Sequence, residues 1–483
     1  MSAAHIDSRA PAEFVRQLRQ RGIQAEAPVD GVLAGDAAMH DRGAPVPALV
    51  VSPRSEGETA QLLRLLHELR IYERMPVSVK SGGHGYFNGA SCTGVMINLS
   101  NLSARHLEDD TLTLKTGCLL GHVVDLLARH HKAVPHGDCF GVGAGGHFLT
   151  AGWDLLLARR HGLGCQSVVG GRIALWDGTV LDVSEAAHPE LLWAMRGGAA
   201  ASVGVVTQLR LRLLEEPTQV TWRLTPLDRE RLALCAKHQA FTRAARLPPE
   251  ISVSFHFHFD PDQAAPVGSF NICSLLRPAA TLESLSHHLG PEITALVADL
   301  AGWSERSLLE FRLLPASDLL AAHPELLAEV STASLHHEPL RYWKRALCAR
   351  EMAESHVSQV SCWVVPECED MLLALYDAFE SAWQHPQRWR MYALVVMGGG
   401  EISARRDHCA MPLGSSLARF EVHWDHAGSQ EQAWSQRKLE EVYSILRSRE
   451  DPAPGRPYRG DVWRADQTSD ARLDAVLAKY DRR

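Results

Sequence analysis

Two glycine-rich stretches decide the fold of this chain: Lys80-Ser81-Gly82-Gly83-His84-Gly85 and Gly141-Val142-Gly143-Ala144-Gly145-Gly146. Successive glycines leave backbone N–H groups unobstructed, and loops of this kind bind pyrophosphate groups. Each stretch has one nucleophilic side chain, His84 inside the first and Cys139 just before the second. Together the two stretches predict one cofactor that is held at two points.

The second stretch also satisfies the pattern G-x-G-x-x-G of nicotinamide dinucleotide sites. Such a site needs a buried strand directly before the first glycine and an acidic residue about 20 positions after the motif. Residues 135–140 lack the pattern of a strand, and Gln166 stands at the position where the acidic residue should be. The sequence therefore argues against a nicotinamide cofactor.

Short apolar runs alternate with helical patterns over the first 215 residues. Ser55 and Glu58 match a capping box at the start of a leucine-rich helix. Asp177-Gly178 predicts a hairpin with a type I′ turn. The expected strands are 48–52, 77–80, 95–99, 112–116, 173–176, 179–183 and 205–213, with a further helix over 120–131.

A boundary is expected near Glu215-Glu216-Pro217, beyond which the elements are longer. Segment 251–260 alternates strictly, with the apolar side chains on one face and His256, His258 and other polar side chains on the opposite face. Further strands are expected at 269–276, 357–365, 391–397 and 417–424. The pattern predicts an α+β protein whose second domain is an antiparallel sheet with helices on one face.

The composition excludes several classes of function. The chain has 483 residues and a net charge of −8, with no block of like charges, which argues against a nucleic-acid or anionic-membrane partner. No stretch approaches the roughly 20 apolar residues of a membrane span. Residues 1–11 contain no apolar segment typical of secretion, so a cytoplasmic location is expected.

Histidines and cysteines are numerous, 25 and 10, but they are scattered and include no CxxC pair. Neither a zinc site nor a disulfide framework is therefore expected. His256 and His258 form an H-x-H pair, but two ligands make no metal site. These histidines either line a substrate pocket or lie on a plain polar face. Tyr342 and Tyr392 are expected in the core.

Several segments resemble one family of flavoproteins. Residues 80–86 resemble the flavin-binding histidine motif of the vanillyl-alcohol oxidase / p-cresol methylhydroxylase superfamily, and residues 138–147 the cysteine motif of its berberine bridge enzyme branch. Residues 153–163 are most similar to hexose oxidases of that branch. Residues 190–198 and 203–205 resemble the family's segment that closes the flavin domain, and residues 479–481 resemble its C-terminal signature.

The resemblance implies FAD that is attached covalently twice, through the His84 ring to the 8α carbon and through the Cys139 sulfur to C6. It implies that backbone around Ser81, Gly82, Gly83, Gly85, Gly143, Gly145, Gly146, Gly204 and Val205 binds the cofactor. The expected domains are an FAD-binding domain at 1–215 with its core at 47–213, a substrate-binding domain at 216–447 whose sheet covers the flavin, and a C-terminal segment at 448–483 that returns to the first domain.

The identity of the catalytic base stays open. Many carbohydrate oxidases of this branch have Tyr-x-Asn-Tyr-x-Asp near the C-terminus, whereas this chain has Pro457-Tyr458-Arg459-Gly460-Asp461. Depending on the alignment, the base position falls on Tyr458 or on Asp461. On the strand 417–424, Glu421 and His423 share a face with Arg419, and the family has a Glu or Gln over the flavin near this position.

The expected activity is that of an oxidase with a small-molecule substrate, in which hydride moves from a substrate carbon to flavin N5 and O2 is reduced to H2O2. A natural-product intermediate with an alcohol or sugar hydroxyl is one substrate class. Oxidative decarboxylation or desaturation is the alternative, because a substrate that supplies its own electrons needs no tyrosine base. The sequence does not define an oligomeric state.

Overall fold

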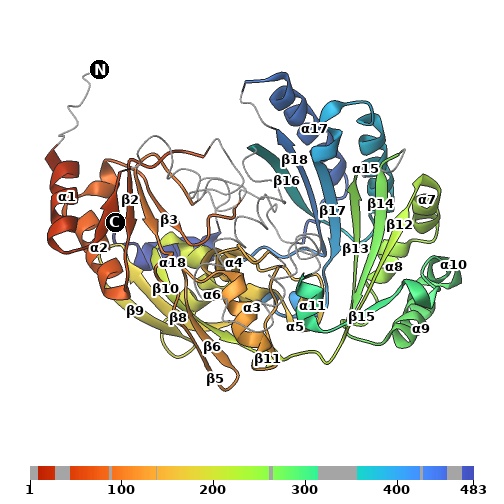
Figure 1. The fold of residues 1–483 in the computed structure, drawn as a ribbon, viewed down its shortest axis with the longest axis horizontal. Coiled ribbons are helices and arrows are strands. Elements are labelled where there is room, and N and C mark those ends of the chain that lie inside the picture. The colour runs from red at the N-terminus through yellow and green to blue at the C-terminus, as the bar shows by residue number, and fades with distance from the viewer. Residues whose placement is uncertain are drawn as a thin grey trace, which may run out of the picture.

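The structure is a computed structural model that describes residues 9–27, 44–85, 90–137, 139–259, 265–313, 356–424, 428–453 and 470–483. Two parts lie side by side, each built around its own sheets and helices (Figure 1). Tyr86, Asp138, Asp260, Tyr342, Tyr458 and Asp461 lie outside the described residues. No described helix is long and apolar enough to cross a membrane.

The first part contains two larger sheets and one short strand pair. In spatial order, the four-stranded sheet is β1 (Gln24–Glu26), β2 (Leu49–Ser52), β4 (Val95–Asn98) and β3 (Val77–Lys80). The five-stranded sheet is β5 (Arg105–Glu108), β6 (Thr111–Lys115), β10 (Gly204–Arg212), β8 (Val168–Leu175) and β9 (Val180–Ser184). The pair is β11 (Leu214–Glu215) with β7 (Lys132–Ala133). The four-stranded sheet contains parallel pairs, and the five-stranded sheet is antiparallel.

Helix α2 (Glu56–Glu68) joins the two larger sheets of the first part. The hydroxyl of Ser55 accepts a hydrogen bond from Glu58 N at 3.1 Å, so the predicted N-terminal cap is present. Leucines 62, 63, 65 and 66 are all buried, in one cluster with Val51 of β2 and Val205 of β10. The helix therefore packs against both sheets.

The predicted hairpin around Asp177-Gly178 is present, but its type I′ turn was wrong. A type I′ turn needs a positive φ at both central residues, and here only Gly178 has one, at 84°. Gly178 N donates to Leu175 O at 2.8 Å, and Thr179 N donates to Asp177 Oδ1 at 2.8 Å. The Asp177 side chain thus closes a longer turn with a single left-handed glycine.

The second part has one seven-stranded antiparallel sheet. Its spatial order is β15 (Ser304–Arg306), β12 (Val220–Leu227), β14 (Val267–Ser274), β13 (Ile251–His258), β17 (Met391–Met397), β18 (Ser416–Trp424) and β16 (His356–Val364). One face carries the apolar side chains of β13 and β18, including Phe255, Phe257 and Phe420, and packs on helices in a single core. Figure 1 shows these helices on the side of the sheet away from the first part. The predicted α+β architecture is confirmed.

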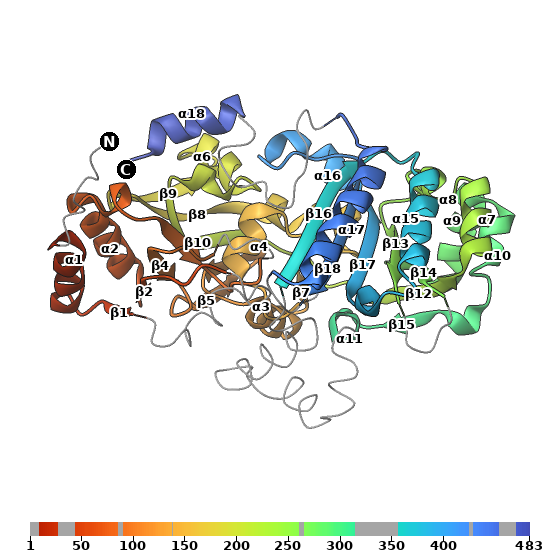
Figure 2. The same cartoon turned by 90° about the horizontal axis from the view of Figure 1, so that it is seen from above.

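The helices divide between the two parts. Those of the first part are α1 (Arg9–Gln20), α2, α3 (Leu120–Ala128), α4 (Ala144–Thr150), α5 (Ala158–His161) and α6 (Pro189–Met195). Between 229 and 447, the helices of the described residues are α7 (Arg229–Lys237), α8 (Ala240–Ala244), α9 (Pro278–Leu289), α10 (Pro291–Ala295), α11 (Leu308–Leu313), α15 (Glu369–Ser381), α16 (Glu401–Ala404) and α17 (Gln430–Arg447). The last helix, α18 (Ala471–Tyr480), lies on α6 of the first part, where Tyr480 Oη donates to Glu190 at 2.5 Å (Figure 2).

Candidate active site

The two glycine-rich stretches lie against each other, backbone to backbone. A Cβ atom on Gly82 would lie 2.3 Å from Gly143 N, and one on Gly143 would lie 2.1 Å from Gly82 N. Neither position can hold a larger residue without moving backbone. His84 is two residues from this contact and Cys139 four, so both candidate attachment residues belong to one site.

A serine hydroxyl closes the contact. Ser81 Oγ donates to Thr116 O at 2.5 Å and accepts from Gly145 N at 3.2 Å. A Cβ atom on Gly145 would lie 2.7 Å from Thr116 O. Gly145 is thus required by close packing, and its N–H group is used within the protein.

Three backbone N–H groups of the second stretch, and that of His147 directly after it, donate to protein carbonyls. Val142, Ala144, Gly145 and His147 donate to Cys139 O, Cys118 O, Thr116 O and Gly143 O, over 2.8 to 3.2 Å. This stretch therefore serves to bring the Cys139 loop against the His84 loop, and these four N–H groups are not a cradle for pyrophosphate.

Open space remains beside two of the glycines. A Cβ atom would meet nothing within 4 Å at Gly85 or at Gly146. Gly83 has a φ of +73°, which a residue with a side chain adopts only with strain. His84 and Cys139 are each only partly buried. The residues present therefore fit a large planar group at this point.

Packing within the first part accounts for the residue types at positions 204 and 205, Gly204 and Val205. A Cβ atom on Gly204 would lie 2.1 Å from Ala174 O of the neighbouring strand β8. Val205 is buried in the core around α2. A contact of these two residues with a cofactor would have to be made by their backbone.

A buried ion pair supports the segment before Cys139. Arg312 of α11 pairs with Asp154 at 2.5 Å, and both side chains are buried. Asp154 Oδ2 accepts from His136 N at 2.9 Å, and Arg312 Nη1 donates to His136 O at 2.6 Å. Burial opposes ionisation of Asp154, but the charge of Arg312 keeps the pKa of Asp154 below its usual value. Both backbone groups of His136 are thereby fixed three residues before Cys139.

Two histidines of this network are neutral at physiological pH. Burial, with the nearby charge of Arg312, lowers the pKa of His136 to about 3. Burial also lowers the pKa of His147 to about 4. Neutral His147 can therefore accept a hydrogen bond through Nε2, which Gly137 N donates at 3.2 Å. Sequence reasoning gave Asp154 and Arg312 no role; their pairing spans 158 residues, and no local pattern indicates it.

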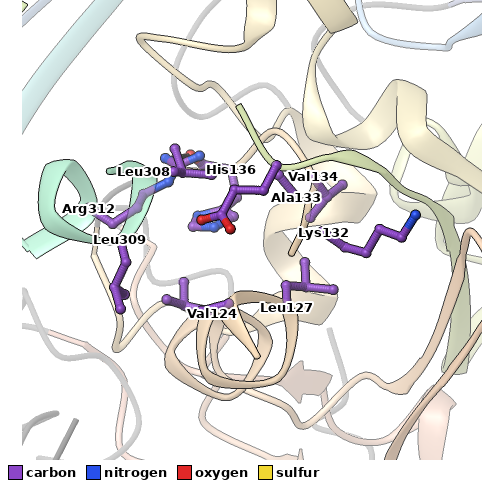
Figure 3. A pocket seen from close by; sticks show the side chains of 11 residues that line it. Val124, Leu127, Lys132, Ala133, Val134, His136, Leu308, Leu309 and Arg312 are labelled. Atoms are coloured by element: carbon purple, nitrogen blue, oxygen red, sulfur yellow. Dashed lines mark hydrogen bonds between the residues drawn. The ribbon is translucent and has the colours of Figure 1, made fainter. Parts of the chain in front are cut away.

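A hollow lies behind this network, between α3, β7 and α11. In Figure 3, His136 and Leu308 face Val124 and Leu127 across it. The lining contains neither His84 nor Cys139, and none of the described polar residues of the second sheet. This hollow is therefore not the candidate active site.

A second group of candidate site residues lies on the polar face of the seven-stranded sheet. On β18, Arg419 Nε donates to Glu421 Oε2 at 3.0 Å, and His423 Nε2 lies 3.9 Å from Glu421 Oε1. Glu421 and His423 are both buried. Burial opposes ionisation of Glu421, but Arg419 and then His423 lower the pKa of this carboxyl group below its usual value. Glu421 is thus a buried carboxylate on the face turned away from the helices.

Tyr392 belongs to this polar face, and its expected place in the core was wrong. It is the direct register partner of Glu421 on the neighbouring strand. Its hydroxyl lies 2.8 Å from His256 Nδ1, and His256 Nε2 lies 2.8 Å from Ser254 Oγ. The signal was available in the sequence, because Tyr392 alternates with Met391 and Ala393, which face the helices.

His256 is neutral and has two hydrogen-bond partners. Burial, with His258 nearby, lowers the pKa of His256 to about 4. Both of its ring nitrogens contact protein hydroxyls, so hydrogen bonding on the polar face accounts for His256. Ser254, His256 and Tyr392 thus form a continuous hydrogen-bonded row.

Comparison with known proteins defines the class of the first part. Residues 47–184 match the family model described as FAD binding domain. Over 151 residues the chain is 36% identical to the chitooligosaccharide oxidase of Gibberella zeae. This stretch makes up 30% of this chain and 30% of that protein. Over 183 residues it is 33% identical to berberine bridge enzyme-like 23 of Arabidopsis thaliana, 36% of this chain and 34% of that protein. In sequence, the chain thus matches about a third of the length of these curated relatives.

The likeness in fold extends much further. A solved structure of berberine bridge enzyme superposes with a TM-score of 0.75 over 96% of this chain and 91% of that chain, at 17% identity. The matched segment is thus similar in sequence to FAD-binding domains of berberine bridge enzyme-like and oligosaccharide oxidase proteins, and the fold of the whole chain is similar to that of berberine bridge enzyme. Residues 47–184 are therefore assigned to an FAD-binding domain.

Proposed function

We propose that this protein is an FAD-dependent oxidase that dehydrogenates a small-molecule substrate with O2 as the acceptor. The observation that carries the proposal is the backbone contact between Gly82 and Gly143, because it brings a histidine loop and a cysteine loop together inside an FAD-binding segment. When bound, FAD takes up hydride from a substrate carbon and passes the electrons to O2, which leaves as H2O2.

We propose that His84 and Cys139 hold the FAD covalently, the former at the 8α carbon and the latter at C6. Ser81 supports this role by fixing both loops to Thr116, and the Asp154–Arg312 pair supports it by fixing His136. The open space at Gly85 and Gly146 is where backbone can approach the cofactor.

The polar face of the second sheet is proposed to handle the substrate proton. Glu421 is a carboxylate and therefore able to accept a proton, and His423 lies beside it. The hydroxyl of Tyr392 can take a proton from substrate while passing its own to neutral His256, so this residue joins Tyr458 and Asp461 as a candidate base.

Two reactions fit this arrangement. Oxidation of an alcohol or a sugar hydroxyl needs a base, which Glu421 or Tyr392 can supply, and the chitooligosaccharide oxidase among the relatives carries a sugar substrate in its name. Oxidative decarboxylation or desaturation of a natural-product intermediate is the second candidate, since Arg419 could bind a substrate carboxylate. A cytoplasmic location, and the domain limits at 215 and 447, stay predictions.

The test is a substrate screen without oxygen. The purified yellow protein is mixed anaerobically with N-acetylchitobiose, cellobiose, benzylic alcohols and phenolic carboxylic acids, and the flavin absorbance is recorded. The proposal predicts bleaching with at least one class, followed by reoxidation and H2O2 release when air is admitted. A sugar product lacking two hydrogens indicates alcohol oxidation, whereas release of CO2 indicates decarboxylation. Protein that purifies without any flavin would contradict the proposal.

A further inference from the structure

Two cysteines from distant parts of the sequence meet where the two parts of the molecule join. Cys165 lies in the 3₁₀ turn η3 (Gly164–Ser167) of the first part, and Cys409 lies in the segment that leads into β18. The two side chains are 0% and 4% exposed. Both belong to one apolar cluster, together with Ala158, Leu163, Trp363, Ile402, Met411 and Leu413.

The backbone on each side of this pair is held in place. Cys165 N donates to Ala151 O at 3.0 Å, and Ala410 N donates to Arg196 O at 2.7 Å. The side-chain amide of Gln166 donates across the junction to Ile402 O at 3.1 Å and also contacts Cys409 Sγ at 3.8 Å. The two sulfur atoms therefore have little freedom to move apart.

The two thiols differ in character. The interaction between the two thiols raises the pKa of Cys165, with burial adding to this, and lowers the pKa of Cys409 although burial opposes it. Isolated buried thiols behave differently, since burial raises the pKa of Cys235 to about 12. The thiolate is the reactive form of cysteine, so Cys409 is the better nucleophile of the pair.

We propose that Cys165 and Cys409 are a redox-active pair that forms a disulfide with hydrogen peroxide and so joins the two parts of the molecule covalently. The Cys409 sulfur attacks one peroxide oxygen, the O–O bond breaks, and the sulfur becomes a sulfenic acid with release of one water. The Cys165 sulfur then attacks this sulfur, the S–O bond breaks, and the departing hydroxide takes the Cys165 proton as a second water.

This disulfide would connect the two parts of the molecule covalently at their junction. Trp153, the neighbour of Asp154, contacts Trp363 of β16 in the same cluster, with ring centroids 5.8 Å apart. A bond between Cys165 and Cys409 would hold this junction closed. The oxidant is the product of the proposed oxidase, but the pairing does not depend on that activity because peroxide can be added.

The test is a thiol map of the purified holoenzyme before and after addition of hydrogen peroxide. After removal of peroxide with catalase, remaining thiols are blocked with iodoacetamide under denaturing conditions and the protein is digested without reductant. We expect a peptide pair that is joined through Cys165 and Cys409, is two hydrogens lighter than its parts and separates with dithiothreitol. The melting temperature of the oxidised protein rises.

Three variants make the result specific. Cys409→Ser abolishes the joined peptides and the rise in melting temperature, and the matched control Cys235→Ser changes neither. Cys165→Ala removes both the second thiol and the group that lowers the pKa of Cys409, so this variant also gives no joined peptides and no rise in melting temperature. The proposal is overturned if both thiols of the wild type are recovered alkylated after peroxide treatment, or if Cys409 pairs with another cysteine.

Discussion

Gly82 and Gly143 pack so closely that a Cβ atom on Gly143 would lie 2.1 Å from Gly82 N and 2.4 Å from Ser81 Oγ. These atoms belong to backbone and to a hydroxyl that is hydrogen-bonded on both sides. A methyl group therefore cannot be admitted by the rotation of one flexible side chain. The contact holds together the two loops to which we assign the cofactor.

Gly143→Ala is expected to destabilise the protein by about 2 kcal/mol, a usual cost of overpacking. Because the substitution separates the His84 and Cys139 loops, the fraction of protein with flavin bound at both residues should fall. Urea unfolding and intact-mass spectrometry measure the two effects. Gly57→Ala is the matched control, since its Cβ atom would meet only Ser55 Oγ at 3.8 Å. If both variants have the same stability and the same fraction of doubly attached flavin, the contact between the loops does not have the role assigned to it.

Tyr392→Phe is expected to slow flavin reduction by about 100-fold, a typical contribution of a general base. The measurement is anaerobic stopped-flow absorbance with the substrate that the screen identifies. Tyr376→Phe is the control, because Tyr376 also uses its hydroxyl in one hydrogen bond, to Pro266 O at 3.2 Å, but lies in the helical core. An unchanged rate in Tyr392→Phe would assign the base to Glu421 or to the segment around Tyr458.

Glu421 should stabilise the fold in a pH-dependent way. Its folded-state pKa is lowered, so its contribution is present above the usual glutamate pKa of about 4.3 and is lost as the pH falls through the lower folded value. Glu421→Gln leaves Arg419 without its charge partner, so the stability difference from wild type should be largest at neutral pH and shrink in acid. Urea unfolding at several pH values tests this. Exposed Glu440→Gln is the control, and a difference that stays constant with pH would refute the ion pair.

A run of four non-glycine residues with positive φ precedes β10. Ala199, Ala200, Ala201 and Ser202 have φ between 45° and 55°. Left-handed backbone costs roughly 1–2 kcal/mol per residue with a Cβ atom. Ser202 is exposed, so Ser202→Gly removes this strain without removing a packed side chain. The greater conformational freedom of glycine in the unfolded state offsets part of the gain, and the net stabilisation of the protein should be about 1 kcal/mol. Ser444→Gly, exposed within α17, should instead cost about 0.5 kcal/mol. A lower melting temperature for Ser202→Gly than for the wild type would contradict the presence of backbone strain at this position.

The sequence defined the elements of this fold better than the contacts between them. Strict alternation located β13 and the faces of β18, because the period of two repeats over eight or nine residues. The predicted type I′ turn is wrong because the Asp177 side chain accepts a hydrogen bond from Thr179 N, which local pattern alone does not reveal. Tyr392 was assigned to the core from its aromatic character, although its alternation with Met391 indicated the polar face.

In the candidate site, too, local features were predicted from the sequence and contacts between distant residues were not. His84 and Cys139 each lie in or beside a glycine-rich stretch that can be recognised from a few neighbouring residues. The sequence alone therefore predicted that the two loops hold one cofactor. The Asp154–Arg312 pair and the Cys165–Cys409 contact join residues far apart in the chain, and a single sequence carries no signal for such pairs. Beyond Cys139, two more of the ten cysteines thus have a proposed chemical role.

The most direct test of the account is acid precipitation of the wild type and of three variants: His84→Ala, Cys139→Ala and the double variant. The account predicts a yellow pellet from the wild type and from each single variant, a colourless pellet from the double variant, and flavin-bearing peptides containing His84 and Cys139 in the wild-type digest. A colourless wild-type pellet would contradict covalent attachment, and a yellow pellet from the double variant would place the attachment elsewhere.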